Sequence, residues 1–334
     1  MLPIAVDAMG GDRAPDEIVE GARRAAAELG VPVVLVGRPE AIEAAGGAGD
    51  LEVIGASEVI EMGDDPATSV RQKKDASLNV AAKAVRDGRA SAMVSAGNTG
   101  ATMGAALLRM GRIGGVARPA IATPIPRPLG EHATVLLDAG ANADCQAQWL
   151  VQFAQMGAVF ARQRFGIAEP RVATLSIGEE KSKGNELVKE AHALLAADGG
   201  AALAAAGARF IGNVEGRDLM GDEADVVVCD GFTGNVALKT LEGGMKTLVT
   251  ALFAVFGATD ETKAATDVLL PHLLPLYGAL DPDNTGGALL LGVDGVCIIS
   301  HGSSSATAIV NAVRVAAEAV EADLVGALRA VVGR

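Results

Sequence analysis

The sequence lacks the long apolar segments and cysteine pairs that would place it in a membrane or in an oxidising compartment. No uninterrupted apolar stretch reaches the roughly 18 residues that a membrane-spanning helix needs. The three cysteines form no CxxC pair and fit no zinc spacing. The first residues, MLPIAVDAMGGD, have no basic flank and are typical of a first strand, not of a signal peptide. We therefore expect a cytoplasmic protein with reduced thiols.

Basic residues are also scarce. The chain has 28 Lys and Arg against 41 Asp and Glu, which gives a net charge of −13. This excess disfavours binding to nucleic acid, or to an anionic membrane by charge alone. The four histidines include no pair with metal-ligand spacing, so we predict no metal and no cofactor. An anionic ligand would have to be held by local groups.

The common phosphate-binding and nucleophile signatures are absent as well. The chain has no GxxxxGK[ST], no GxGxxG and no GxSxG, which disfavours NTPases, ordinary dinucleotide dehydrogenases and α/β-hydrolases. What it has instead is five glycine-rich turns, each directly after a short apolar stretch: DAMGGD (7–12), SAGNTGATMGA (95–105), DAGAN (138–142), CDGFTGN (229–235) and SHGSSS (300–305). Backbone amides at helix starts can bind an oxyanion, although tight strand-to-helix packing explains any single turn equally well.

Alternating apolar and helical patterns predict an α/β fold. Strand composition is found at 3–6, 32–36, 91–94, 120–125, 133–137, 172–175, 208–211, 226–229 and 296–299. Helical periodicity covers 15–29, 75–85, 144–164 and 303–330. We expect a three-layer αβα arrangement with a largely parallel sheet, a single catalytic domain over 1–334, and all five turns at one edge of the sheet.

Residues 236–280 interrupt this alternation. Two helical patterns, 236–257 and 261–280, follow one another with no strand between them, which predicts a helical hairpin. Pro271 and Pro275 would kink or end its second arm. Apolar side chains near the tip would contact a membrane surface or, alternatively, form the core of a dimer. These tip residues are Leu252, Phe253, Phe256, Leu269, Leu270 and Leu273.

Two polar stretches supply candidate catalytic groups. In CDGFTGNVALKTLEGG, Asp230 ends a strand and Gly231 permits a positive φ. Thr233 and Asn235 stand at the start of the next helix, where they cap it or orient a phosphate and a carbonyl group. In SIGEEKSKGNEL, Lys183 lies at a helix start, which opposes the helix dipole unless an anion lies beside it.

Two further groups are candidates on weaker patterns. His301 follows a strand and is either a hydrogen-bonded structural residue or a proton donor. Arg71, Lys73 and Lys74 form a basic run in an acidic chain, which indicates a docking patch for an acidic protein or simply a solvated face.

Taken together, the motifs resemble the PlsX family of phosphate acyltransferases. The match runs in order over nearly the whole chain: DAMGGD, SAGNTGA, GEEKSKGNEL, GNVEGRD, CDGFTGNVALKTLEG and GGALLLGV followed by SHGSS. The resemblance implies a homodimer with a fold like that of isocitrate dehydrogenases and phosphotransacetylases. Two departures are local: Arg13 stands where the family often has histidine, and Ala76 and Ser77 stand where it has paired serines.

The resemblance also implies a reaction. An acyl group would pass reversibly from an acyl-acyl-carrier-protein thioester to inorganic phosphate, and the acyl phosphate would feed a membrane glycerol-3-phosphate acyltransferase in phospholipid synthesis. This chemistry needs no protein nucleophile, because thiols ionise near a pKa of about 8.5 and leave readily. Bound phosphate can attack directly, provided that the oxyanion is stabilised.

Within that chemistry each candidate has an expected role. Asn235 would donate to the thioester carbonyl or to phosphate, Asp230 would orient the phosphate or take its proton, and His301 would protonate the departing thiolate. The predicted phosphate ligands are Asn98, Thr99, Gly100, Gly231 and Thr233, together with Lys183.

Three alternatives remain. A phosphate acetyl- or butyryltransferase would use coenzyme A thioesters in the same chemistry. A non-catalytic membrane scaffold would recruit acyl carrier protein without consuming phosphate. A decarboxylating dehydrogenase of similar fold would need a metal-binding aspartate cluster, which the sequence does not show.

Overall fold

The computed structural model describes residues 1–128 and 130–333, in which eleven strands form one sheet. The strand order is β3-β2-β1-β4-β11-β10-β5-β6-β9-β7-β8. In chain order the strands are β1 (Ile4–Asp7), β2 (Val33–Gly37), β3 (Glu52–Gly55), β4 (Ala92–Ser95), β5 (Ala120–Ile125), β6 (Thr134–Leu137), β7 (Arg171–Leu175), β8 (Arg209–Val214), β9 (Val226–Val228), β10 (Ala288–Leu291) and β11 (Val296–Ile299).

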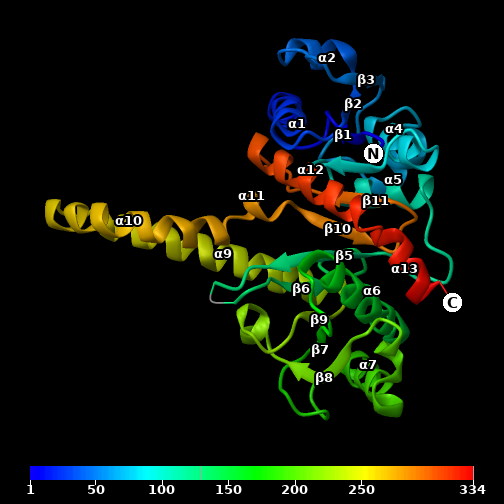
Figure 1. The fold of residues 1–334 in the computed structure, drawn as a ribbon, viewed down its shortest axis with the longest axis vertical. Coiled ribbons are helices and arrows are strands. Elements are labelled where there is room, and N and C mark those ends of the chain that lie inside the picture. The colour runs from blue at the N-terminus through cyan, green and yellow to red at the C-terminus, as the bar shows by residue number, and fades with distance from the viewer. Residues whose placement is uncertain (129, 334) are drawn as a thin grey trace.

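Helices cover both faces of this sheet (Figure 1). They are α1 (Asp16–Leu29), α2 (Pro39–Ala44), α3 (Pro66–Gln72), α4 (Ser77–Arg86), α5 (Thr99–Arg109), α6 (Ala147–Phe165), α7 (Glu186–Ala196), α8 (Ala201–Ala204), α9 (Gly231–Phe256), α10 (Asp260–Leu280), α11 (Pro282–Thr285), α12 (Ala306–Glu321) and α13 (Leu324–Val332).

The sheet lies between two apolar cores, which gives three layers. Helices α1, α12, α13, α6 and α7 share one core with one face of the sheet. The other face packs on α4 and α5 in one half and on the first turns of α9 in the other half. Strand β1 shows the division, because Ile4 and Val6 enter the first core and Ala5 the second. The predicted αβα arrangement is confirmed.

Most strand pairings are parallel, and the antiparallel ones all involve β5 or β10. Strand β5 joins two half-sheets that run in opposite directions. Its first residues, 120–122, pair with β10, and its last residues, 123–125, pair with β6. On one side β10 leads to β11, β4 and β1, and on the other side β6 leads to β9 and β7.

The two half-sheets are staggered along β5, so their carboxyl ends meet. Ile299, the last residue of β11, pairs with Ala288, whose neighbour Leu289 pairs with Ala122. Leu136, near the end of β6, pairs with Thr123. Both carboxyl ends therefore stop beside the middle of β5. The expectation of a single edge is wrong: three glycine-rich turns follow one half-sheet and two follow the other.

Several element boundaries also differ from the sequence expectation. Strands β3 and β10 were not predicted, because β3 is largely exposed and β10 lies within a glycine-rich motif. The single helical pattern over 303–330 is divided into α12 and α13. The division lies at Asp323, which has a φ of 47° and caps α13 with its side chain.

Helices α9 and α10 project from the body of the molecule as an antiparallel hairpin (Figure 1). Helix α10 continues through Pro271 and Pro275, so neither proline ends it. The carbonyl groups that lose a partner belong to Asp267 and Pro271, which are both exposed and can bond to water. In residues 1–128 and 130–333, no helix is both long and apolar enough to cross a bilayer.

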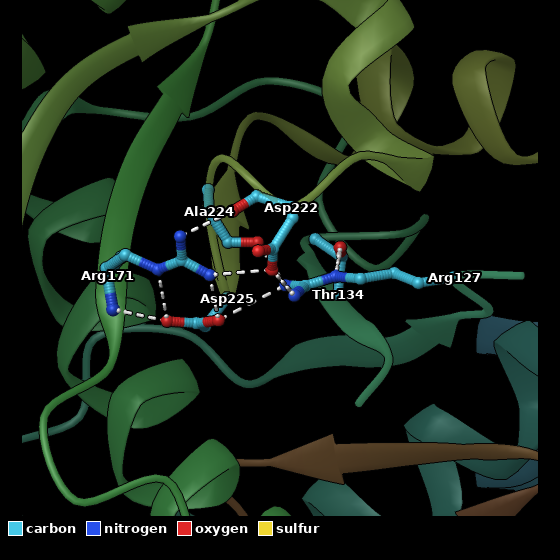
Figure 2. A network of polar contacts seen from close by, with 6 residues as sticks. All are labelled: Arg127, Thr134, Arg171, Asp222, Ala224 and Asp225. Atoms are coloured by element: carbon cyan, nitrogen blue, oxygen red, sulfur yellow. Dashed lines mark hydrogen bonds and ion pairs between the residues drawn. The ribbon is translucent and has the colours of Figure 1, made fainter. Parts of the chain in front are cut away.

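A buried network of charges fastens the amino ends of β6, β7 and β9 (Figure 2). The Arg127 side chain, only 3% exposed, donates to Thr134 Oγ1 at 2.7 Å and to Asp225 Oδ1 at 3.2 Å. Arg171 donates to both oxygens of Asp225, at 2.9 and 3.0 Å. Burial acts to raise the pKa of Asp225, but the hydrogen bonds from Arg171, joined by Arg127, outweigh it and lower that pKa.

We predict that Asp225→Asn lowers the free energy of unfolding by about 3–5 kcal/mol, because it leaves two arginines facing a neutral amide. Since the native pKa of Asp225 lies below its ordinary value, its stabilisation is present above that ordinary value and is lost as the pH falls toward the native pKa. The variant should therefore lose less stability than the parent between about pH 4 and pH 2. Urea denaturation across this range measures both effects.

Asp222→Asn is the matched control. Asp222 contacts the same two arginines, but its side chain is 81% exposed, so its ion pairs should contribute little. Equal losses in the two variants would contradict the role given to burial at Asp225.

Candidate functional site

The turns after β1, β4 and β11 pack on one another with no room for side chains. A Cβ on Gly97 would lie 2.5 Å from the Gly10 Cα, and a Cβ on Gly10 would lie 2.6 Å from the Gly97 amide nitrogen. The Asp12 amide donates to the Gly302 carbonyl at 2.7 Å. Packing therefore explains these glycines, and the three turns form one rigid floor at the end of this half-sheet.

Asp7 lies beneath this floor. Its carboxylate is 1% exposed and accepts hydrogen bonds from Ser95 Oγ at 2.7 Å and from the Met9 amide at 3.2 Å. Burial raises the pKa of the Asp7 carboxyl, and hydrogen bonds from Ser77, Ser95 and Met9 oppose this shift. Asp7 thus fixes the relative positions of β1, β4 and α4, because Ser95 ends β4 and Ser77 begins α4.

The SAGNTGA turn leads into α5 and is crossed by the segment around Met62. Asn98 caps α5 by accepting from the Ala101 amide at 3.1 Å, and its side-chain amide donates to the Met62 carbonyl at 3.0 Å. The Asn98 backbone amide contacts the Met62 sulfur at 3.0 Å. The amides of Thr99 and Gly100 precede the capped amide in the first turn of α5, where a helix has no acceptor of its own. The prediction that these two amides bind an oxyanion therefore stays a prediction.

The turn after β6 is filled by a carboxylate of the chain itself. Asp138 is fully buried and accepts from the amides of Ile121, Gly140, Ala141 and Asn142 at 2.7–3.1 Å. Burial raises the pKa of the Asp138 carboxyl, while these amides and the Asn142 side chain favour its charged form. The DAGAN amides therefore bind Asp138 instead of a ligand.

The amino end of α9 is also capped from within. Asp230 accepts from the Thr233 amide and from Thr233 Oγ1, both at 2.8 Å. Gly231 does not have the positive φ expected of it; it is glycine because a Cβ would lie 2.8 Å from Asp138 Oδ2 and 2.7 Å from the Asn142 carbonyl oxygen. Asp230, the residue expected to act on phosphate, is thus the helix cap.

The amides at the start of α12 are likewise hydrogen-bonded to side chains of the protein itself. Glu17 of α1 accepts from the Ala306 amide at 2.6 Å, and the Ser305 side chain accepts from the Ala308 amide at 3.3 Å. A carboxylate already occupies the first turn of α12. Three of the five predicted anion-binding turns are therefore neutralised by Asp138, Asp230 and Glu17.

Two side chains of α9 contact the turns at the junction, the place beside β5 where the carboxyl ends of the two half-sheets meet, and one of them crosses to the other half-sheet. Asn235 donates to the Ala139 carbonyl after β6 at 3.2 Å. Lys239 Nζ lies 3.1 Å from His301 Nε2, after β11, and 2.8 Å from Glu242 Oε2. Helix α9 thus connects the two half-sheets where their carboxyl ends meet. Lys183 lies in the turn after β7, the neighbour of β9.

The three basic residues of the predicted docking patch, Arg71, Lys73 and Lys74, differ in how exposed their side chains are. Lys73 Nζ is 2.6 Å from Asp64 Oδ2 and donates to the Val59 carbonyl at 2.7 Å, so it fastens the segment before α3. Arg71 and Lys74 are exposed.

Cysteine chemistry does not contribute a nucleophile at the junction. Cys145 and Cys229 lie beside the carbonyls of Asn142 and Asp138. Burial, followed by the charge of Asp138, raises the pKa of the Cys145 thiol to about 12. Burial also raises the pKa of Cys229 well above its ordinary value, so both thiols are protonated near neutral pH. In the part of the chain described, no group of three or more His, Cys, Asp and Glu is placed to hold a metal ion.

Sequence reasoning missed Asp138 and Lys239. The sequence analysis named Asp138 only as part of the DAGAN turn. An acidic residue directly after a buried strand indicates a carboxylate that can accept hydrogen bonds from the amides of the following turn. Lys239 stands in the quoted CDGFTGNVALK stretch, two helical turns after the cap, so helical spacing alone would have placed it near the same junction.

We predict that Gly97→Ala lowers the free energy of unfolding by about 1–3 kcal/mol, because its Cβ would overlap the Gly10 backbone. Gly63→Ala is the control, since a Cβ there meets nothing within 4 Å and the residue lies in the neighbouring segment. Urea denaturation of both variants tests the packing explanation. Equal stability of Gly97→Ala and the parent would show that the turn is glycine-rich for another reason.

Comparison with known proteins gives one consistent answer. The chain matches the family model described as "Fatty acid synthesis protein" over residues 2–326. A phosphate acyltransferase from Heliobacterium modesticaldum is 49% identical over 334 residues, covering 98% of this chain and 97% of that protein. A phosphate acyltransferase from Desulforudis audaxviator is 47% identical, covering 99% of this chain and 96% of that protein.

Solved structures with the same fold include EutD phosphotransacetylase from Staphylococcus aureus, with a TM-score of 0.62 at 17% identity, covering 96% of this chain and 94% of that one. A 4-hydroxythreonine-4-phosphate dehydrogenase from Klebsiella pneumoniae has a TM-score of 0.53 at 14% identity, covering 96% and 100%. At these identities the likeness shows the fold alone, and the expected phosphotransacetylase-like fold is confirmed.

Proposed function

Because the chain belongs to the family of phosphate acyltransferases, we propose that it moves a fatty acyl group reversibly from acyl-acyl carrier protein to inorganic phosphate. The observation that carries this proposal is the meeting of the two half-sheets beside β5. The start of α5 follows β4, the neighbour of β11, and α9 reaches His301 after β11. Both helices therefore border one junction, where phosphate and a thioester could be brought together.

The proposed step is a direct displacement. A phosphate oxygen forms a bond to the thioester carbonyl carbon, and the tetrahedral oxyanion then collapses. The carbon–sulfur bond breaks, its electron pair leaves with the sulfur, and the thiolate takes up a proton. The products are acyl phosphate and the free carrier-protein thiol. Positioning of the two reactants alone is worth about 7–11 kcal/mol.

We propose the following roles for individual residues in this direct displacement. The amides of Thr99 and Gly100, with Asn98 and Lys183, would hold phosphate. Asn235 would donate to the oxyanion, an interaction worth about 3–4 kcal/mol in comparable sites. We expect Asp230, Gly231 and Thr233 to act by fixing the start of α9, because the hydrogen bonds of Asp230 are already directed at Thr233.

Acyl carrier protein is the proposed donor. Exposed Arg71 and Lys74, with Lys73 anchoring their segment, offer positive charge to an acidic partner. The alternative donor is a coenzyme A thioester. It is compatible with this fold, because EutD phosphotransacetylase has the same fold. Both alternatives share the phosphate chemistry and differ only in the thiol.

The product would pass to a membrane glycerol-3-phosphate acyltransferase. We propose a cytoplasmic homodimer whose α9–α10 hairpin is an arm on a single catalytic domain and touches the membrane peripherally. Support comes from exposure near the tip, where Leu252, Phe253 and Leu269 are 44–50% exposed. Phe256, Leu270 and Leu273 are partly covered, and Phe253 packs edge-on against Phe256 with ring centres 6.0 Å apart.

The first test measures release of carrier-protein thiol from palmitoyl-acyl carrier protein with and without phosphate, and traps acyl phosphate with hydroxylamine. We expect phosphate-dependent release, and at least a tenfold lower rate in Asn235→Ala and in Lys183→Ala with the fold retained. Palmitoyl-coenzyme A in parallel identifies the preferred thiol. Tight carrier-protein binding without release would favour the scaffold alternative.

For the hairpin, we predict that Phe253→Asp abolishes flotation with anionic liposomes, because it places a charge in the apolar tip. Thr247→Asp adds the same charge on the same helix without removing an apolar side chain, and should float like the parent. Light scattering of each variant separates membrane contact from dimer formation. Flotation that survives in Phe253→Asp, with a change in mass, would assign the tip to the dimer.

A further inference from the structure

Lys239 occupies an unusual position at the junction of the half-sheets. Its Nζ lies 3.1 Å from His301 Nε2 and 2.8 Å from Glu242 Oε2, while its side chain remains 48% exposed. The contact with His301 links the helix after β9 to the turn after β11, so the ammonium group lies between the two groups of turns. It is held on two sides and still open to a ligand.

The contact decides what His301 can do. An ammonium group only donates hydrogen bonds, so in this contact His301 Nε2 accepts, which assigns the ring proton to Nδ1. Ser303 Oγ lies 3.0 Å from Nδ1 and can accept a hydrogen bond from the Nδ1–H group. The Ser303 amide N–H also points at Nδ1, but at 3.5 Å this contact is at the limit of hydrogen bonding and weaker than the contact with Lys239. In the opposite tautomer, the Nε2–H group of His301 would point at the Lys239 ammonium group, which has no lone pair to accept it.

The charges around the junction show why a cation there matters. Asp138, Asp230 and Glu17 use the amides of three helix starts or turns, so those amides are not available to phosphate. The chain also carries a net charge of −13, which repels an anion. A phosphate that reaches the start of α5 therefore needs positive charge from a side chain near β4 and β11. Lys239 supplies it, because its partner His301 lies two residues after the end of β11, the neighbour of β4.

We propose that Lys239 is a phosphate-binding cation of this enzyme, in addition to Lys183, and that His301 is a positioning residue that holds it. This rests on the proposed phosphate acyl transfer; it adds Lys239 to the proposed phosphate ligands and changes the role of His301. His301 acts as a hydrogen-bond acceptor for Lys239 and does not protonate the thiolate from Nε2.

The test compares the KM for phosphate and kcat among four variants. Lys239→Met should raise the phosphate KM about 10- to 100-fold, the loss of one charged hydrogen bond, with little change in the KM for the acyl donor. Lys246→Met removes the same charge two turns further along α9 and should leave the phosphate KM unchanged. Circular dichroism and urea denaturation confirm that each variant is folded.

The His301 variants separate positioning from proton transfer. His301→Gln keeps an accepting oxygen and should remain within about threefold of the parent, whereas His301→Ala should raise the phosphate KM about 3- to 10-fold, because only the alanine variant lacks an acceptor. If His301 is the proton donor, both variants lose kcat equally and the inference fails.

The outcomes also keep this inference apart from the proposed function. A parent enzyme with no phosphate-dependent thiol release refutes the function itself. A parent that is active, with an unchanged phosphate KM in Lys239→Met, refutes the inference alone.

Discussion

The pairing of β5 with two strands that belong to opposite half-sheets determines where everything else in this molecule lies. One strand of six residues gives its first half to β10 and its second half to β6, and both partners run against it. Because β10 is in turn antiparallel to β11, the half-sheet that begins at β11 runs opposite to the one that begins at β6. Their stagger brings both sets of carboxyl ends to the middle of β5. In an ordinary parallel sheet the loops of one edge would face open solvent. Here the loops of one half face the loops of the other.

This arrangement creates an electrostatic problem that the chain solves with its own carboxylates. Helix starts and glycine-rich turns present amides with positive character, and several of them converge here. Asp138, Asp230 and Glu17 satisfy those amides, at distances of 2.6–3.1 Å. The turns are thereby rigid without a ligand. The consequence is that an external anion meets few unoccupied donors, and for this reason we propose that the Lys239 side chain contributes to binding it.

The sequence was a good guide to elements that are buried and periodic. Strands β5 and β11 coincide with the predicted runs, and α1 begins one residue later than predicted and ends where predicted, because their burial leaves a clear apolar pattern. Strand β3 escaped prediction because it is mostly exposed. The opposite directions of the half-sheets could not be predicted either, since they depend on the pairing of β10, a strand that comes late in the chain, with β5.

In the candidate site, too, the sequence predicted individual residues better than the contacts between them. Individual residues such as Asp230 and His301 were found, because acids and histidines after buried strands stand out. The partner of His301 was not found, since its contact with Lys239 joins residues 62 positions apart. The hydrogen bond between Asp230 and Thr233 is local, because the two residues are three positions apart. The sequence nevertheless predicted a capping role only for Thr233 and Asn235, and not for Asp230.

The strength of the contacts at the junction indicates which of them serve the fold and which serve a ligand. Backbone pairing through β10 and β5, and the fully buried Asp138, hold the half-sheets together. The contact of Lys239 with His301 is exposed, and exposed charged contacts contribute little to stability. An exposed lysine whose two partners fix its position adds almost nothing to folding, yet it loses rotamer freedom that a flexible surface lysine keeps. That loss is useful only if the ammonium group must be in place before an anion arrives.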